Sequence, residues 1–180
     1  VSVGRFEEAL AIYDEFLALD PSASATHLVH GHTLKTIGRT DEAIESYRSV
    51  YKAKPDFGDA YWSLANLKTY RFTEDEIGLM KKYQLSEKTS LDDKIHLCFA
   101  LGKAMEDRKD FVAAGDYYLQ GNKIKNGEVK YDKERMSYKM SLQRKFCTAE
   151  LFNEFGESGC LASDPIFIVG LPRAGSTLLE

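Results

Sequence analysis

The sequence predicts a mostly α-helical fold: an array of helix–turn–helix repeats, followed by the first strand and phosphate loop of a truncated α/β domain. Two observations predict it. Anchor residues recur 34 residues apart in the N-terminal part, and a short apolar run precedes a glycine-containing loop near the C-terminus. We expect three parts: repeats in residues 1–126, connecting helices and a linker in 127–160, and the start of the α/β domain in 161–180.

Four kinds of residue recur at the 34-residue spacing. The pairs are Gly4 and Gly38, Ala9 and Ala43, Tyr13 and Tyr47, and Pro21 and Pro55. We expect the glycines to turn the chain with positive φ, the alanines to let two helices cross closely, and the prolines to end a helix. The tyrosines are expected to fill space toward the next unit. This period is that of the tetratricopeptide helix–turn–helix unit.

The spacing predicts four units. The first is represented by its second helix alone, in residues 1–21, so its first helix would precede Val1. The second unit covers residues 24–57. The third opens at Gly58 and has an atypical second helix, which starts at a capping box in residues 73–76. The fourth starts at Ser90, after a short insertion in the third unit. Residues 128–156 keep a helical pattern, which we assign to one or two further helices.

The C-terminal stretch has the order strand, glycine loop, helix. Residues 166–169 are apolar and rich in β-branched side chains, which is typical of a buried strand in a parallel sheet. Backbone N–H groups and a helix N-terminus after such a strand can hold a phosphate. The nucleotide triphosphatase loop needs a lysine where this chain has Ser176. A P-loop nucleotide phosphotransferase is therefore the less favoured alternative.

The loop Pro172-Arg173-Ala174-Gly175-Ser176-Thr177 resembles the 5′-phosphosulfate-binding loop of sulfotransferases, in the version found in tyrosylprotein sulfotransferases. Together with the repeats, the chain resembles bacterial proteins in which tetratricopeptide units precede a sulfotransferase domain. The resemblance implies an enzyme that transfers a sulfuryl group from 3′-phosphoadenosine-5′-phosphosulfate to a hydroxyl, such as that of a protein tyrosine or a glycan. It implies a nucleotide sulfate donor as a partner and no metal.

The same resemblance implies a role for each loop residue. Arg173 would bind the donor and offset the charge that develops in the transition state. The backbone N–H groups of Ala174, Gly175, Ser176 and Thr177 would bind the 5′-phosphate. The family usually has serine in place of Ala174, and one lost hydrogen bond is worth about 1 kcal/mol. The catalytic base and the 3′-phosphate site would lie beyond residue 180, so we expect this chain alone to be inactive.

The repeats themselves predict a binding surface. In units of this kind the first helices line a concave groove that takes a protein or peptide partner. The residues expected to line it are Leu28, His32, Trp62, Asn66, Thr69, Phe99 and Lys103. Trp62 and Asn66 would form a recognition pair. The alternative to a sulfotransferase is therefore a non-enzymatic tetratricopeptide scaffold or binding module, and a plain spacer between domains is the simplest case.

Composition excludes other classes of protein. A net charge of −4 and a pI of about 5.7 argue against a nucleic-acid partner. No apolar run approaches the roughly 20 residues of a membrane span. The three cysteines are widely spaced, which indicates a reducing compartment, and we expect a cytoplasmic protein. His27, His30 and His32 have no further ligand nearby in the sequence, so we expect no metal site.

Overall fold

The structure is a computed structural model that describes residues 4–128 and 132–156. These residues form helices and connecting loops, and no strand occurs among them. The chain divides into two units, Val1–Tyr131 and Asp132–Glu180, and each is described by itself. The strand predicted at 166–169 and the phosphate loop at 172–177 lie outside the described residues.

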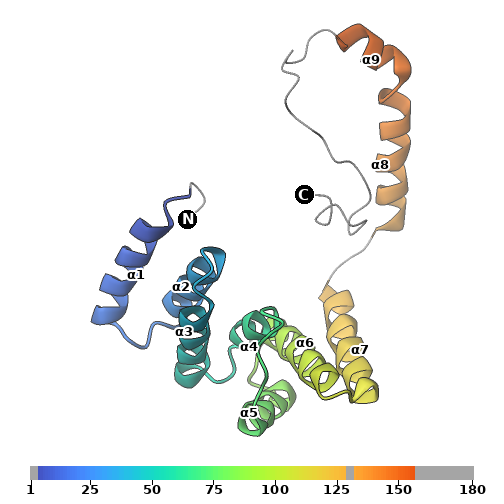
Figure 1. The fold of residues 1–180 in the computed structure, drawn as a ribbon. Helices are drawn as coiled ribbons and strands as arrows, with labels where there is room; N and C mark the ends of the chain where they lie inside the picture. The colour runs from blue at the N-terminus through green and yellow to red at the C-terminus, as the bar shows by residue number, and fades with distance from the viewer. Residues whose placement is uncertain (1–3, 129–131, 157–180) are drawn as a thin grey trace. The chain divides into compact units, whose positions relative to one another are not determined.

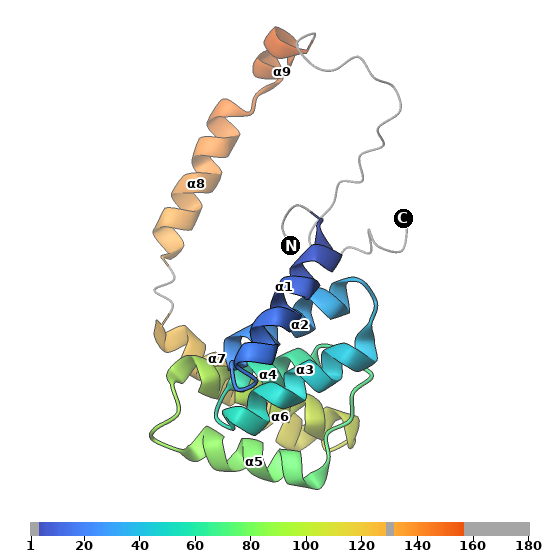
Figure 2. The same ribbon diagram turned by 90° about the vertical axis from the view of Figure 1, so that its left-hand side faces the viewer.

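The first unit is a succession of helices that pack on their neighbours (Figures 1 and 2). The helices are α1 Phe6–Leu19, α2 Ser24–Thr36, α3 Thr40–Ala53, α4 Gly58–Ala65, α5 Glu74–Leu85, α6 Leu91–Asp107 and α7 Phe111–Glu128. The main contacts join α1 to α2, α2 to α3, α3 to α4, α4 to α6, α5 to α6, and α6 to α7. Consecutive helix–turn–helix units therefore share a continuous core, as a repeat array requires.

The second helix–turn–helix repeat, formed by α2 and α3, has the form that the spacing predicts. Gly38 turns the chain between the two helices with a φ of 84°, and Gly4 has a φ of 79° immediately before α1. Because an L side chain is strained in this left-handed region, glycine is favoured at both positions. Ala43 is completely buried where α3 crosses α2.

The tyrosine anchors behave differently from one another. The ring of Tyr13 meets His30 of the next unit, with 6.3 Å between ring centroids, as expected. Tyr47 packs within its own unit, since a Cβ placed on Gly31 of α2 would lie 2.6 Å from its ring. That Tyr47 also fills space toward the next unit stays a prediction. Gly31 is small because the tyrosine ring occupies the space that a side chain would need.

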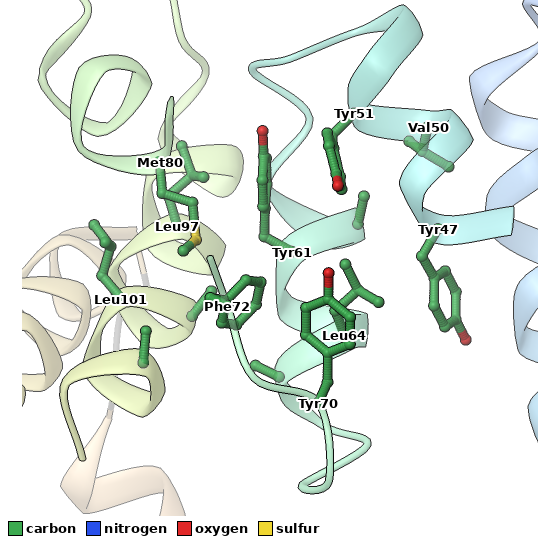
Figure 3. Close-up of a cluster of buried hydrophobic side chains, with 14 of the residues drawn as sticks. Tyr47, Val50, Tyr51, Tyr61, Leu64, Tyr70, Phe72, Met80, Leu97 and Leu101 are labelled. Carbon is green, nitrogen blue, oxygen red and sulfur yellow. The ribbon is translucent and has the colours of Figure 1, made fainter. Parts of the chain in front are cut away.

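The third unit departs from the helix–turn–helix form. Its first helix, α4, has 8 residues where α2 has 13, and the left-handed Lys68 follows it with a φ of 62°. The loop between α4 and α5 buries the rings of Tyr70 and Phe72 (Figure 3). Because these rings take space beside α4, α5 makes its main helix contact with α6 instead.

The insertion predicted in the third unit lengthens the next helix. α6 has 17 residues, four more than α2, and is capped by Ser90, whose side chain accepts a hydrogen bond from the Asp93 N–H. Lys109, with a φ of 63°, follows α6 as Gly38 follows α2. The chain absorbs the added residues in an extra first turn, and the turn at the other end of the helix is unchanged.

The core of the first unit runs through all of its later helices (Figure 3). The rings of Tyr51 on α3 and Tyr61 on α4 are stacked, with centroids 4.8 Å apart. The largest fully buried side chains include Tyr47, Tyr61, Leu34, Leu64, Met80, Leu97 and Leu101.

In the C-terminal of the two compact units, Asp132–Glu180, the described helices are α8 Lys133–Phe146 and α9 Ala149–Phe155. Asp132 and Thr148 cap these helices, each accepting a hydrogen bond from a backbone N–H in the first turn. Neither helix has a buried residue. No helix in the described part of the chain is both long enough and apolar enough to span a membrane.

Candidate partner-binding surface

The seven residues predicted to line a groove lie on, or immediately after, the first helices of three consecutive units. Leu28 and His32 are on α2, Trp62 is on α4, Asn66 and Thr69 follow α4, and Phe99 and Lys103 are on α6. Residues four positions apart on a helix share a face. Leu28 and His32 therefore lie on one face of α2, and Phe99 and Lys103 lie on one face of α6.

Two of the predicted residues touch across helices, and a third ring extends the contact. The Trp62 and Phe99 rings have centroids 5.6 Å apart, and Phe99 is 6.1 Å from the ring of Tyr118 on α7. All three side chains are only partly buried. We call Trp62, Phe99 and Tyr118 the aromatic row. It combines large apolar area with the polar edges of an indole N–H and a phenol, the combination favoured in protein interfaces.

Tyr118 was not among the predicted surface residues. Its position matches that of Tyr47 after the insertion, and a Cβ on Gly102 would collide with its ring, as a Cβ on Gly31 would with Tyr47. Its hydroxyl donates a hydrogen bond to Glu106 at 3.0 Å. The repeat spacing could have identified Tyr118, but its contact with Phe99 comes from the crossing of α6 and α7.

Lys103 does not present a free positive charge. Its ammonium forms an ion pair with Asp107, and a second one with Glu106 at 3.4 Å. Arg71, from the loop after α4, also contacts Asp107 at 3.3 Å. The hydrogen bond to Asp107 raises the pKa of Lys103 above its ordinary value. An anionic partner group would therefore have to compete with carboxylates that are already in place.

His32 is a neutral side chain at this surface. Its Nδ1 lies 2.9 Å from the Tyr47 hydroxyl, within hydrogen-bond distance. Burial lowers the pKa of His32 below its ordinary value, and the nearby Asp59 offsets this only in part. The side chain can exchange a hydrogen bond with a partner but does not add a cation near pH 7.

The remaining predicted residues differ in exposure. Leu28 is partly buried against the core, whereas Asn66 and Thr69 are exposed. The Thr69 hydroxyl donates to the Leu67 carbonyl oxygen at 3.3 Å. Asn66 follows Trp62 by four positions, and its side-chain amide is exposed.

A separate hollow of about 500 Å³ lies among α1, α2 and α3. Its lining includes Asp14, His27, His30, Asp41, Glu42 and Glu45. His30 lies 2.7 Å from the Ser46 hydroxyl and 3.4 Å from an Asp14 carboxylate oxygen. Burial lowers the pKa of His30, and the charge of Asp14 acts in the opposite direction. The sequence did not predict this hollow, because its acidic side chains come from two helices that are distant along the chain.

No cluster of His, Cys, Asp or Glu in residues 4–128 and 132–156 could hold a metal ion. The predicted donor-binding residues Arg173, Ala174, Gly175, Ser176 and Thr177 lie outside the described residues. Their arrangement stays a prediction from the sequence.

Comparison with known proteins identifies the repeat. Residues 25–57 match the family model of the tetratricopeptide repeat. An uncharacterized protein of Aquifex aeolicus (strain VF5) is 26% identical over 149 residues, which are 83% of this chain and 19% of that protein. The tetratricopeptide repeat and J domain-containing co-chaperone DNJ1 of Fusarium oxysporum f. sp. lycopersici is 34% identical over 68 residues, 38% of this chain and 13% of that protein. The chain thus spans a fifth or less of either relative.

A solved structure, that of MamA, has a TM-score of 0.37 and 19% sequence identity, and covers 72% of this chain and 94% of that chain. At this score and identity, we draw no conclusion about function from the similarity.

These findings correct the prediction of an enzyme. The family that matches is a helical repeat, and no comparison indicates an enzymatic family. The predicted sulfotransferase identity has no support from them, and the alternative of a tetratricopeptide scaffold fits better. Residues 25–57 match the tetratricopeptide repeat, and the helices on either side of them pack on their neighbours as further helical units.

Proposed function

We propose that this chain is a non-enzymatic binding module in which the aromatic row captures a peptide segment of a protein partner. The observation that carries the proposal is the row itself: three partly exposed rings from three helices, in contact across the array. Tetratricopeptide repeats support protein–protein interaction as the general function.

The chemistry of the surface favours an uncharged or weakly charged peptide with a bulky apolar anchor. Lys103 is paired with carboxylates, and the pKa of His32 is lowered below its ordinary value, so neither side chain offers the free cation that an acidic tail would need. The rings offer apolar area, and the exposed Asn66 amide can pair with the backbone of an extended peptide.

The test is selection of peptides from a displayed random library against the chain, followed by calorimetric titration of the selected sequences. We expect Trp62→Ala to weaken binding by at least 10-fold, which corresponds to about 1.4 kcal/mol. Asn66→Ala should weaken it less. Leu85→Ala is the matched control, because Leu85 is an exposed apolar residue on α5, away from the row.

Circular dichroism and thermal unfolding of each variant separate lost binding from lost fold, since Trp62 also packs partly against the core. If selected peptides bind Trp62→Ala and Leu85→Ala equally well, the aromatic row is not the binding surface. We also keep two predictions from the sequence. One is binding of 3′-phosphoadenosine-5′-phosphosulfate at residues 173–177, with no enzymatic step attached, and the other is a cytoplasmic location.

A further inference from the structure

The hollow of about 500 Å³ among α1, α2 and α3 is lined by no member of the aromatic row. α2 contacts both α1 and α3, and each of the three helices contributes side chains to its walls (Figure 2). Four of these side chains are carboxylates: Asp14, Asp41, Glu42 and Glu45. No lysine or arginine of the described residues lines the hollow. Its volume suits a small molecule or one side chain of a partner.

His27 lines the hollow and carries a buried hydrogen-bond acceptor that no described residue satisfies. Its Nε2 lies 2.9 Å from the Pro21 carbonyl oxygen. Because a carbonyl oxygen only accepts, Nε2–H is the donor in the neutral ring, and Nδ1 is left as an acceptor. Buried polar atoms without a partner are rare in proteins. A donor from a bound group would complete the hydrogen bonding of this ring.

His30 adds no positive charge to the hollow near pH 7. Its side chain is 15% exposed, and burial lowers its pKa below the ordinary value of 6.5. Its Nε2 lies 3.4 Å from an Asp14 carboxylate oxygen, and its Nδ1 lies 2.7 Å from the Ser46 hydroxyl. Since the carboxylate only accepts, Nε2 carries the proton and the Ser46 hydroxyl donates to Nδ1. A neutral ring leaves the charge of Asp14 uncompensated.

The carboxylates of the hollow differ in whether a cation already holds them. Glu42 and Glu45 form ion pairs with arginines at 2.5 Å and 2.8 Å. Asp14 and Asp41 form no ion pair with a lysine or arginine in the part of the chain that the structure describes. The groups left open are therefore two carboxylates and the Nδ1 of His27, all of them acceptors. Their complement is a cation that donates several hydrogen bonds and accepts none.

We propose that this hollow binds the guanidinium group of an arginine side chain from a protein partner, with Asp14 and Asp41 as counter-ions and His27 Nδ1 as a further acceptor. The site is separate from the aromatic row and does not depend on it. A guanidinium is planar and has five N–H donors, so it can pair with a carboxylate and reach a ring nitrogen together. Asp14 is 69% exposed, so a side chain on another protein can reach it.

The test is a titration of the ¹⁵N-labelled full chain, followed by nuclear magnetic resonance. The first probe is a tripeptide with a central arginine and blocked ends, and the second has citrulline, the uncharged isostere, in its place. We expect saturable shifts of the Asp14, His27 and Asp41 amides with the arginine peptide, and binding weaker by about 5-fold or more with citrulline. Agmatine, a free guanidinium compound, is the third probe. Tighter binding of agmatine than of the peptide would overturn the assignment to a protein side chain.

Matched variants locate the site. Asp14→Asn should weaken binding of the arginine peptide by about 5-fold or more, because a carboxylate that accepts a charge-assisted hydrogen bond is lost. Glu15→Gln removes the same charge from the next residue of α1, which is exposed and does not line the hollow. That change should weaken binding by about 2-fold at most at physiological salt. Equal binding of the arginine and citrulline peptides, or equal effects of the two substitutions, would overturn the proposal.

Discussion

Two pairs of consecutive helices approach each other closely at a glycine that faces a tyrosine ring. Gly31 faces Tyr47, and Gly102 faces Tyr118, at the same spacing along the chain. Because Tyr47 is completely buried and its hydroxyl lies 2.9 Å from His32 Nδ1, its ring has no free space into which to move. A residue with no side chain is therefore required opposite it, although glycine in a helix interior costs about 1 kcal/mol relative to alanine.

We predict that Gly31→Ala destabilises the chain by about 1–3 kcal/mol, because overpacking against the Tyr47 ring outweighs the gain in helix propensity. Gly78→Ala is the matched control. Gly78 is also inside a helix, but nothing lies within 4 Å of a Cβ added there. That variant should be stabilised by up to about 1 kcal/mol. Urea unfolding measures both, and a stabilising Gly31→Ala would show that the helices separate freely.

At the scale of the element, the start of α5 depends on one buried carboxylate. Glu76 is 6% exposed and accepts hydrogen bonds from the hydroxyls of Tyr51 at 2.7 Å and Tyr70 at 2.5 Å. It also accepts one from the Thr73 N–H at 2.8 Å, which completes the predicted capping box. The sequence predicts the box from its residue order. The two tyrosines are added by the packing of α3 and of the loop after α4.

These hydrogen bonds decide the protonation of Glu76. Burial by itself raises the pKa of the Glu76 carboxyl, and the hydrogen bonds from Tyr70, Thr73 and Tyr51 lower it below the ordinary value of 4.5. Since the pKa is lower in the folded chain than in the unfolded one, the resulting stability is present above about pH 4.5. It is lost as the pH falls through the folded-state pKa.

We predict that Glu76→Gln lowers the free energy of unfolding by about 1–3 kcal/mol at pH 7, because the groups that donate to this carboxylate lose an ionised acceptor. The difference from the wild-type chain should shrink as the pH falls from about 5 to 3. Glu74→Gln is the control, since the Glu74 side chain is 82% exposed and forms a surface ion pair with Arg108. That change should cost less than about 1 kcal/mol. A Glu76→Gln difference that does not vary with pH would contradict this account.

At the scale of the whole molecule, the two units differ in how their helices are stabilised. Helices of the first unit are held by shared burial, as α6 shows with eight buried residues. In the unit Asp132–Glu180, α8 has no buried residue. Its large apolar side chains are between 47% and 63% exposed: Met136, Tyr138, Met140 and Phe146. An isolated helix of this length is marginal in water.

We therefore predict that backbone amides in α8 exchange with solvent almost as fast as in an unfolded peptide. Amides in the middle of α6 should exchange with an opening free energy close to the free energy of global unfolding. Native-state hydrogen exchange measured by mass spectrometry distinguishes the two segments. Protection of α8 comparable to that of α6 would show that its exposed side chains are covered in solution.

The elements that depend on local chemistry could be predicted from the residues alone. The 34-residue spacing predicts α2 and α3 and positive φ at Gly4 and Gly38, and the residue order 73–76 predicts the capping box of α5. Turns and caps can be predicted in this way because they are set by neighbouring residues. The same local reasoning produced the sulfotransferase prediction from a short loop motif. The comparisons contradict the prediction of an enzyme. That prediction was the weaker one because a motif of six residues carries far less information than a repeat of 34.

Contacts between side chains that are distant along the chain could not be predicted from the residues and were revealed by the packing of the helices. The aromatic row joins side chains from α4, α6 and α7, and Lys103 is neutralised by Asp107, which Arg71 also contacts from the loop after α4. Such contacts depend on how the helices cross and on which helices pack together, as α5 does with α6. Spacing along the chain specifies the face of a helix, but the packing between helices specifies what that face touches.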